Sequence, residues 1–352
     1  MQSIERATVL LRDANSLDGA VAILRELGFS DPPLPLDSTA LTALGFPQSI
    51  GPAWITQGQG SLRGLTVDLH DVAETRDALT SLANALARRA PQLLWIVIAF
   101  ARSRRELALV CWSSTVSRTR IVSLLCNQDK LFESDAETLC ALSAVASDTD
   151  LTIHARWLDV LGREAITRRF FRTLQTIVGE LADSLGGRIN RAERRELALL
   201  YVSRLIFLSF LETKGWLNAD FGFLGNGYSR CVEETGSYQK QVLEPLFFGT
   251  LNTAVQSRSR RALSFGRIPF LNGGLFARSH LEKRYRHWAF TDDAFGNLYG
   301  SLLSRYRFSG REDSAGWSDA SIDPEMLGKA FEALMASDER KTSGAFYTPQ
   351  GW

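Results

Sequence analysis

The stretch SGAFYTP, at 343–349, combines residue types that could form one wall of a ligand site. Its Ser-Gly-Ala part carries little side-chain bulk, so backbone amides there could approach a ligand closely. Phe346 and Tyr347 supply flat apolar surface, and the Thr and Pro that follow supply a hydroxyl and a fixed turn. Such a loop suits a ligand with a polar amino-acid end and an aromatic base. An ordinary turn is the alternative interpretation of the same composition.

Arginine dominates the basic residues, because only six of the forty are lysines and the other 34 are arginines. The planar, permanently charged guanidinium suits phosphate and base recognition, although genomic codon bias would give the same excess. The cluster without acidic neighbours lies in SRSRRALSFGR and contains Arg258, Arg260, Arg261 and Arg267. We expect these four to contact DNA phosphates, with a solvated charged face as the alternative.

The N-terminal half does not match the pattern of a metal-dependent nuclease. Such an enzyme needs an acidic residue and then Glu-x-Lys on an adjacent strand. Asp68 and Asp71 precede an apolar strand without an acid, and Glu106 is followed two residues later by Ala108 instead of Lys. A decayed nuclease-like fold or an unrelated α+β module fits better. The four cysteines form no CxxC pair and the four histidines are scattered, so we predict neither a metal site nor a catalytic residue.

The composition is that of an ordinary globular protein, with 352 residues, 45% apolar and 22% charged. The net charge of +1 argues neither for nucleic acid nor against it. Unpaired cysteines and a charged, amphipathic N-terminus favour a reduced cytoplasmic protein without a signal peptide. The most apolar stretch, Leu197–Leu211, is too short for a bilayer and contains Arg204, which indicates a buried core helix and no membrane partner.

Residues 1–150 predict a small α+β module. Three apolar runs, which short polar links should join into an antiparallel meander, are expected as strands at Leu93–Ala101, Glu106–Trp112 and Arg120–Cys126. Helices are expected within 1–30 and at about 72–89 and 134–146.

The periodicity becomes helical in the second half of the chain. Apolar residues recur at spacings of three and four from Ile166 to Leu185, which predicts a long amphipathic helix. A second helix is expected at about 191–214, where Gly215 ends it. The segments expected beyond this pair are helical pieces near 239–256 and 294–306, a polar linker at Arg311–Asp319, and a helix that begins at Asp323-Pro324.

The block SIDPEMLGKAFEALMASDERKTSGAFYTP, at 321–349, resembles the start of the methyltransferase domain in adenine-specific DNA methyltransferases of the type IIG-like restriction–modification and phage-defence family. In that family a PE-LG--FE helix precedes a K-(S/T)GAFYTP loop. The resemblance implies contacts to the methionine part of S-adenosylmethionine from Ala345, Phe346, Tyr347, Thr348 and Pro349.

Two upstream segments carry the same resemblance. IPFLNGGLF, at Ile268–Phe276, resembles the family's P-LNGGLF segment, and LYVSRLIFLSFLETKGWL, at Leu200–Leu217, resembles its RL-F--FLE-KG-L helix. REAITRRFF, at Arg163–Phe171, is similar to the helix before it. The blocks follow the family's order and cover roughly 150–352, whereas 1–150 is only loosely like the N-terminal regions of such proteins.

The sequence departs from the family after this loop. The glycine-rich loop that holds the rest of the cofactor is absent, as is the Asn-Pro-Pro-Tyr-type segment that grips the flipped adenine. Both follow the GAFYTP loop in the family. We therefore expect a truncated product, an engineered fragment or one half of a split enzyme.

The predicted fold is α+β and mainly helical, with the module at 1–150, a helical domain at 151–315, and the start of a Rossmann-like methyltransferase domain at 316–352. The resemblance implies that the complete protein methylates adenine in double-stranded DNA with S-adenosylmethionine. This chain alone should not bind that cofactor tightly. It should serve DNA contact or scaffolding, with the missing catalytic half or another defence subunit as partner. The alternative is a non-catalytic DNA- or partner-binding module of a defence system.

Overall fold

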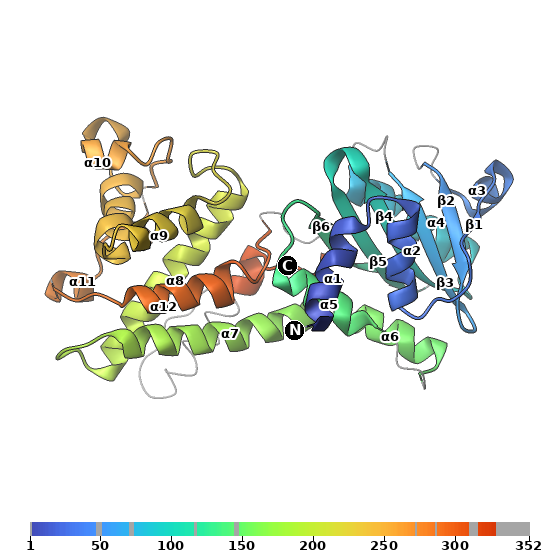
Figure 1. The fold of residues 1–352 in the computed structure, drawn as a ribbon, viewed down its shortest axis with the longest axis horizontal. Helices are drawn as coiled ribbons and strands as arrows, with labels where there is room; N and C mark the ends of the chain where they lie inside the picture. Colours follow the sequence, from blue (N-terminus) through green and yellow to red (C-terminus); the bar gives the residue numbers. More distant parts are fainter. Residues whose placement is uncertain are drawn as a thin grey trace. The chain divides into compact units, whose positions relative to one another are not determined.

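The computed structural model describes residues 2–46, 51–69, 74–115, 118–143, 148–271, 273–285, 287–309 and 316–328. The protein is an α+β protein whose chain divides into two compact units (Figure 1). Unit 1 comprises Met1–Arg168 and Asp313–Ile322, and unit 2 comprises Arg169–Glu312 and Asp323–Trp352. Unit 1 extends past residue 150 and also includes a short segment near residue 317, and the three domains expected from the sequence stay a prediction.

Unit 1 is built on a seven-stranded mixed sheet whose spatial order follows the chain. The strands are β1 (Leu34–Pro35), β2 (Ala53–Gln57), β3 (Leu62–Asp68), β4 (Leu94–Ala101), β5 (Glu106–Ser114), β6 (Thr119–Asn127) and β7 (Trp317–Asp319). Helix α4 (Thr75–Arg89) joins the parallel strands β3 and β4, and β7 lies parallel to β6. The other neighbours are antiparallel. The three predicted strands are therefore the centre of a larger sheet.

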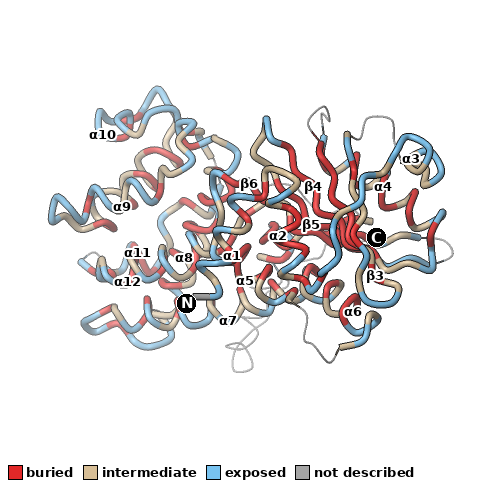
Figure 2. Tube along the Cα trace, turned by 45° about the vertical axis from the view of Figure 1, so that its right-hand side comes forward, coloured by how far each residue is buried: buried red, intermediate tan, exposed pale blue. Residues whose placement is uncertain are grey.

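Side chains of the central strands alternate between two cores. On β4, Ile98 and Phe100 face the core formed with helices α1 (Gln2–Asp13), α2 (Leu17–Glu26), α5 (Glu133–Leu142) and α6 (Asp150–Val160). Val97 and Ala99 face the opposite core, which α4 covers. Both faces of the central strands are buried (Figure 2), which explains why these strands form continuous apolar runs in the sequence.

The linker predicted at Arg311–Asp319 requires a correction, because its described end forms the strand β7. Trp317 is 3% exposed, and the guanidinium of Arg76 lies over its ring at 5.3 Å. The hydroxyl of Ser123 donates to the carbonyl oxygen of Ser318 at 3.1 Å. Pairing with β6 gives hydrogen-bond partners to backbone groups of this polar segment. The composition of the segment alone does not indicate that pairing.

Strands β2 and β3 were not predicted, although they form a hairpin. A short turn that contains Gly58 and Gly60 joins them, and Gly60 has a φ of 57°. These glycines were the feature of the sequence that could have predicted the hairpin turn. Helix α6 was also missed; its Ile153 and Trp157 are buried in the core of unit 1.

Unit 2 is helical in its described residues. Helix α7 (Arg163–Ser184), which begins in unit 1, and helix α8 (Arg191–Thr213) confirm the predicted pair. Gly215, with a φ of 70°, ends α8 as predicted. The amides of Gly215 and Trp216 donate to the carbonyl oxygens of Glu212 and Leu211, each at 2.9 Å. None of the described helices has both the length and the apolar character needed to cross a bilayer.

The rest of unit 2 consists of short helices and π-helical segments. They are α9 (Phe223–Glu233), η2 (Gln239–Leu243), η3 (Pro245–Leu251), η4 (Val255–Ser257), α10 (Arg260–Leu263), η5 (Gly274–Phe276), α11 (His280–Arg284), α12 (Asp292–Leu298) and η6 (Tyr299–Leu303). The pieces predicted near 239–256 and 294–306 are present, but η2, η3 and η6 have π-helical geometry. Such geometry is rare and is frequently found at functional sites.

Arg204 of α8 is fully buried and binds three separate groups. Its guanidinium forms a bidentate ion pair with Glu282, at 2.7 and 3.0 Å. It also donates to the carbonyl oxygens of Leu275 at 2.7 Å and Ala277 at 2.8 Å. Burial raises the pKa of Glu282, but the hydrogen bonds and charge of Arg204 outweigh this effect and hold that pKa below its usual value.

Replacing Arg204 with Met should lower the free energy of unfolding by about 3–5 kcal/mol, because Glu282 would remain buried without its counter-charge. Urea unfolding followed by tryptophan fluorescence measures this effect. The same change at Arg284, whose ion pair lies at the surface with the arginine 65% exposed, should cost less than about 1 kcal/mol. Equal losses in the two variants would contradict the role assigned to the buried pair.

Candidate nucleic-acid interface

The C-terminal ligand wall predicted from the sequence falls outside the described residues. This applies to all five residues expected to contact the cofactor, namely Ala345, Phe346, Tyr347, Thr348 and Pro349. The described part of that block contains the start of its helix. A carboxylate oxygen of Asp323 accepts a hydrogen bond from the amide of Met326 at 2.8 Å, so the helix begins where predicted.

Arg258 points into the protein, unlike the other members of its cluster. The residue is 9% exposed. Its guanidinium donates to the carbonyl oxygens of Thr253 at 3.1 Å, Ile268 at 2.9 Å and Pro269 at 3.2 Å. These hydrogen bonds join the two ends of the 253–269 segment. Arg258 therefore has a structural role. Its guanidinium is turned inward, whereas the other three arginines expected to contact phosphates face outward.

Arg260, Arg261 and Arg267 lie on the surface of the same segment. Ser259 caps the short helix α10 by accepting a hydrogen bond from the amide of Ala262, which is fully buried, and this orients the two arginines of α10 outward. Arg261 donates to the carbonyl oxygen of Gln241 at 2.5 Å. No Asp or Glu occurs between Glu244 and Glu282, so the segment presents positive charge without a neutralising neighbour in the sequence.

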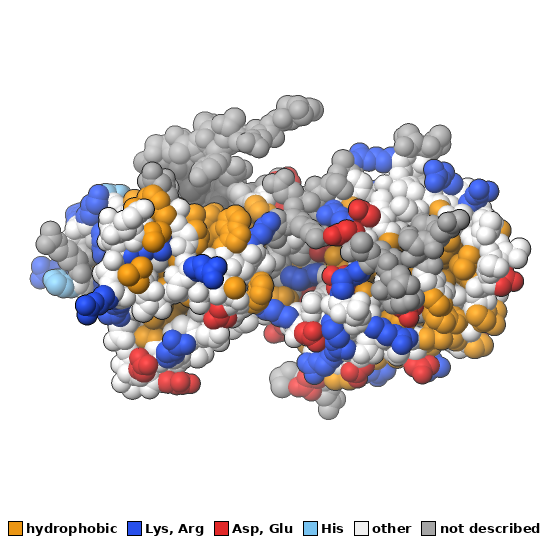
Figure 3. Space-filling model, turned by 90° about the horizontal axis from the view of Figure 1, so that it is seen from above, with side chains coloured by type: hydrophobic (Ala, Val, Ile, Leu, Met, Phe, Trp, Pro, Cys, Tyr) orange, Lys and Arg blue, Asp and Glu red, His pale blue; other side chains and the backbone are white. Residues whose placement is uncertain are grey.

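A groove of about 860 Å³ runs between the turn after α8 and the 255–269 segment; we call it the α8–α10 groove. Its walls carry large exposed apolar side chains, with Trp216 56%, Val255 53% and Leu263 51% exposed. Arg267 lines the same groove. Figure 3 shows hydrophobic and basic side chains side by side on one face of unit 2. The groove therefore combines apolar surface with a cation.

A reciprocal pair of hydrogen bonds sets the width of this groove. The amide of Asn218 donates to the carbonyl oxygen of Arg267 at 2.9 Å, and the amide of Arg267 donates to the side-chain oxygen of Asn218 at 3.0 Å. Gly266 allows this approach, because its φ is 80° and a Cβ there would lie 2.3 Å from the Asn218 oxygen. Only glycine meets both requirements at low cost.

The acids considered for a nuclease are engaged by arginines and a threonine. Asp68 ends β3, and its carboxylate lies 3.5 Å from Arg102. Glu106 begins β5 and accepts hydrogen bonds from Thr75 at 2.6 Å and Arg104 at 3.1 Å. Asp71 lies outside the described residues. Within the described ranges, no group of three or more His, Cys, Asp or Glu side chains is placed to hold a metal ion.

The LNGGLF segment serves mainly as a structural turn. Phe276 is 1% exposed and packs on Phe247 with ring centroids 5.6 Å apart, whereas Phe270 is 43% exposed. The amide of Leu271 donates to the carbonyl oxygen of Leu251 at 2.7 Å. In the sequence, the charge of Arg204 argues only against a membrane helix. In the structure the same side chain fixes this segment through the carbonyl oxygens of Leu275 and Ala277, a role that a charge inside an apolar helix could have signalled.

Comparison with known proteins gives one partial match. A curated protein of Methanocaldococcus jannaschii, named as a candidate type II restriction enzyme and methyltransferase, is 30% identical over 165 residues. Those residues make up 45% of this chain and 14% of that protein, so the match spans a small part of the relative's length. No family model matches the chain. No solved structure matches it either.

Replacing Arg258 with Ala should lower the free energy of unfolding by about 1–3 kcal/mol, because buried carbonyl oxygens would lose their donors. Replacing the exposed Arg260 with Ala should change it by less than about 0.5 kcal/mol. Thermal unfolding of the two variants beside the parent protein measures the difference. If the variants are equally stable, Arg258 does not hold the segment together.

Proposed function

We propose that this chain is the N-terminal portion of an adenine-specific DNA methyltransferase of a restriction–modification or phage-defence system, and that it holds the DNA substrate. The observation that carries the proposal is the 30% identity over 165 residues to the Methanocaldococcus jannaschii protein. That likeness supports a restriction–modification role in general. The adenine specificity and the use of S-adenosylmethionine rest on the resemblance of the C-terminal block.

The DNA contact is assigned to Arg260, Arg261 and Arg267. All three are exposed and belong to a segment without acidic residues. A guanidinium binds phosphate oxygens with two parallel hydrogen bonds, and its charge displaces counterions from the DNA. Arg258 contributes indirectly by holding the segment in shape. Contacts of this kind position a duplex without reading its sequence.

A second candidate function is the docking of another polypeptide, such as the catalytic half of a split enzyme or a defence subunit. The observation that favours it is the apolar wall of the α8–α10 groove, where Trp216 and Leu263 are more than half exposed. Large exposed apolar side chains that lie together often mark interaction sites. Loss of partner binding in a Trp216→Ser variant that retains DNA binding would favour this candidate.

Replacing Arg260, Arg261 and Arg267 together with Gln should weaken binding to duplex DNA. The slope of log K against log salt should become shallower by about 0.9 for each phosphate that the variant no longer neutralises. Fluorescence anisotropy with a labelled duplex between low and physiological salt measures both quantities. The matched control replaces three exposed arginines of unit 1, Arg12, Arg25 and Arg88, with Gln. An equal loss of affinity in the control would mean that only total charge matters.

Calorimetric titration of S-adenosylmethionine into the chain tests the proposal about the cofactor. We expect no measurable heat, because the GAFYTP loop supplies one wall of the site and the glycine-rich loop that completes it is not in this sequence. Heat should appear when a polypeptide carrying that loop is added. Stoichiometric binding to the chain alone would show that the site is complete here, and would refute the division of the site between two segments.

A further inference from the structure

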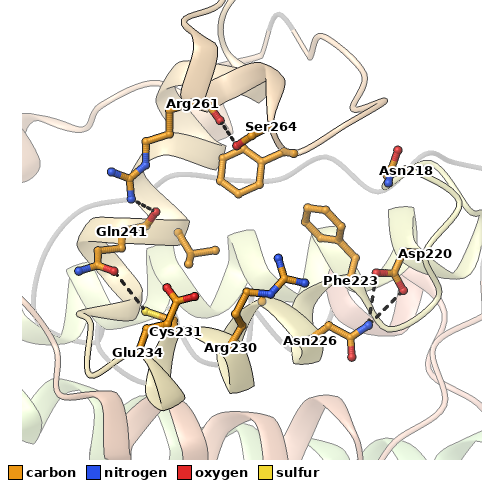
Figure 4. A pocket seen from close by; sticks show the side chains of 13 residues that line it. Asn218, Asp220, Phe223, Asn226, Arg230, Cys231, Glu234, Gln241, Arg261 and Ser264 are labelled. Atoms are coloured by element: carbon orange, nitrogen blue, oxygen red, sulfur yellow. Dashed lines mark hydrogen bonds between the residues drawn. The ribbon is translucent and has the colours of Figure 1, made fainter.

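We propose that a pocket beside α9 in unit 2 binds a single nucleotide. The pocket has a volume of about 360 Å³ and lies between α9, the π-helical segment η2 and the α10 region (Figure 4). This volume is at the small end of the roughly 300–1,000 Å³ typical of ligand sites. It admits a ligand of mononucleotide size and excludes a duplex. The inference goes beyond the proposed function, although Arg261 lines this pocket and is also one of the arginines assigned to DNA.

Arg230 places a guanidinium in the pocket, and this group has no hydrogen-bond or ion-pair partner among the described residues. Its side chain extends from α9 into the pocket (Figure 4). Arg261 stands on the opposite wall and donates one hydrogen bond, to the carbonyl oxygen of Gln241. An uncommitted guanidinium in a concave site is suited to bidentate binding of a phosphate group.

Two aromatic rings form the apolar part of the pocket. Phe223 projects from α9 and Phe265 from the segment after α10, with ring centroids 6.3 Å apart and planes inclined at 55°. The rings already contact each other, so a ligand would stack against the corner that they form instead of between them. Every nucleobase has a flat π face that can use such a surface.

The polar groups favour a ligand with hydrogen-bond donors as well as an anion. Glu234 lines the pocket and can only accept hydrogen bonds. Its charge disfavours a bare anion beside Arg230, but it suits the exocyclic amine or sugar hydroxyl of a nucleotide. Asn226 is held in place by Asp220, whose two carboxylate oxygens accept from its amide nitrogen at 3.3 Å each. The mixed lining therefore points to a nucleotide instead of inorganic phosphate.

The backbone beside the pocket has an unusual geometry. Gln241 and Val242 line it from η2, and a second π-helical segment, η3, follows after Glu244. A π-helical turn is wider than an α-helical one, and such turns are frequently found at functional sites. The carbonyl oxygen of Gln241 is turned toward Arg261 and accepts its hydrogen bond, so the π segment sets the position of one wall of the pocket.

The test measures the affinity of the full chain for the four deoxynucleoside monophosphates, for inorganic phosphate and for deoxyadenosine by calorimetry. A single-stranded oligonucleotide is titrated separately by anisotropy, because the nucleotide could be free or part of a DNA strand. We expect at least one monophosphate or the oligonucleotide to bind. Arg230→Gln should weaken that binding about tenfold, the equivalent of one charge-assisted hydrogen bond. Inorganic phosphate and deoxyadenosine should each bind to the parent protein more weakly than the complete nucleotide does.

The controls separate the pocket from the surface arginines. Arg188→Gln removes an exposed arginine from the turn between α7 and α8 and should leave nucleotide binding unchanged. Phe265→Leu should lower the affinity for the nucleotide but leave the affinity for inorganic phosphate unchanged. Binding of the oligonucleotide alone, weakened by Arg230→Gln, identifies a strand as the source of the nucleotide. Binding of no probe, or equal binding by the Arg230 variant and the parent protein, overturns the proposal. Because Arg261 lines the pocket and also belongs to the arginines assigned to DNA, the duplex measurement is repeated with Arg230→Gln, which alters the pocket alone and should leave duplex binding unchanged.

Discussion

The described core of unit 2 depends on one buried charge pair, Arg204 with Glu282. An arginine inside an apolar helix is costly to desolvate, and the cost is offset only when every donor finds an acceptor. Here the acceptors come from two places far along the chain, the carbonyl oxygens of Leu275 and Ala277 and the carboxylate of Glu282. The pair therefore fixes where the chain after α10 must return to α8. Hydrophobic packing alone would tolerate several such returns, because it has no direction.

The 253–269 segment applies the same chemistry on a smaller scale. Arg258 binds three carbonyl oxygens and Asn218 clamps the backbone at Arg267. With its shape set by these hydrogen bonds, the segment can present its remaining arginines outward and form one side of two adjacent depressions. One is the apolar α8–α10 groove and the other is the smaller polar pocket beside α9. The two depressions differ in their linings, because the groove is walled mainly by apolar side chains and the pocket carries Arg230, Glu234 and Asn226.

Features encoded locally were predictable from the sequence, and features set by distant contacts were not. The spacing of apolar residues from Ile166 to Leu185 predicted α7, and Gly215 predicted the end of α8. Periodicity and capping both depend on residues only a few positions apart. The central strands followed from their apolar runs. The inward direction of Arg258 could not be predicted, since its partners lie up to eleven residues away on a turn of irregular backbone. For the same reason Trp317 gave no sign that it pairs with β6, almost two hundred residues earlier.

The position of β7 has a consequence for how the protein is made. Strand β6 is complete at Asn127, but the strand that pairs with Ile121–Ser123 on its outer edge is Trp317–Asp319. During synthesis the whole of unit 2 up to Glu312 must leave the ribosome before that edge can be closed. For that interval β6 carries unpaired backbone groups, which are the usual starting point for pairing with another chain. Closing this edge of unit 1 therefore waits for a segment that is made after most of unit 2.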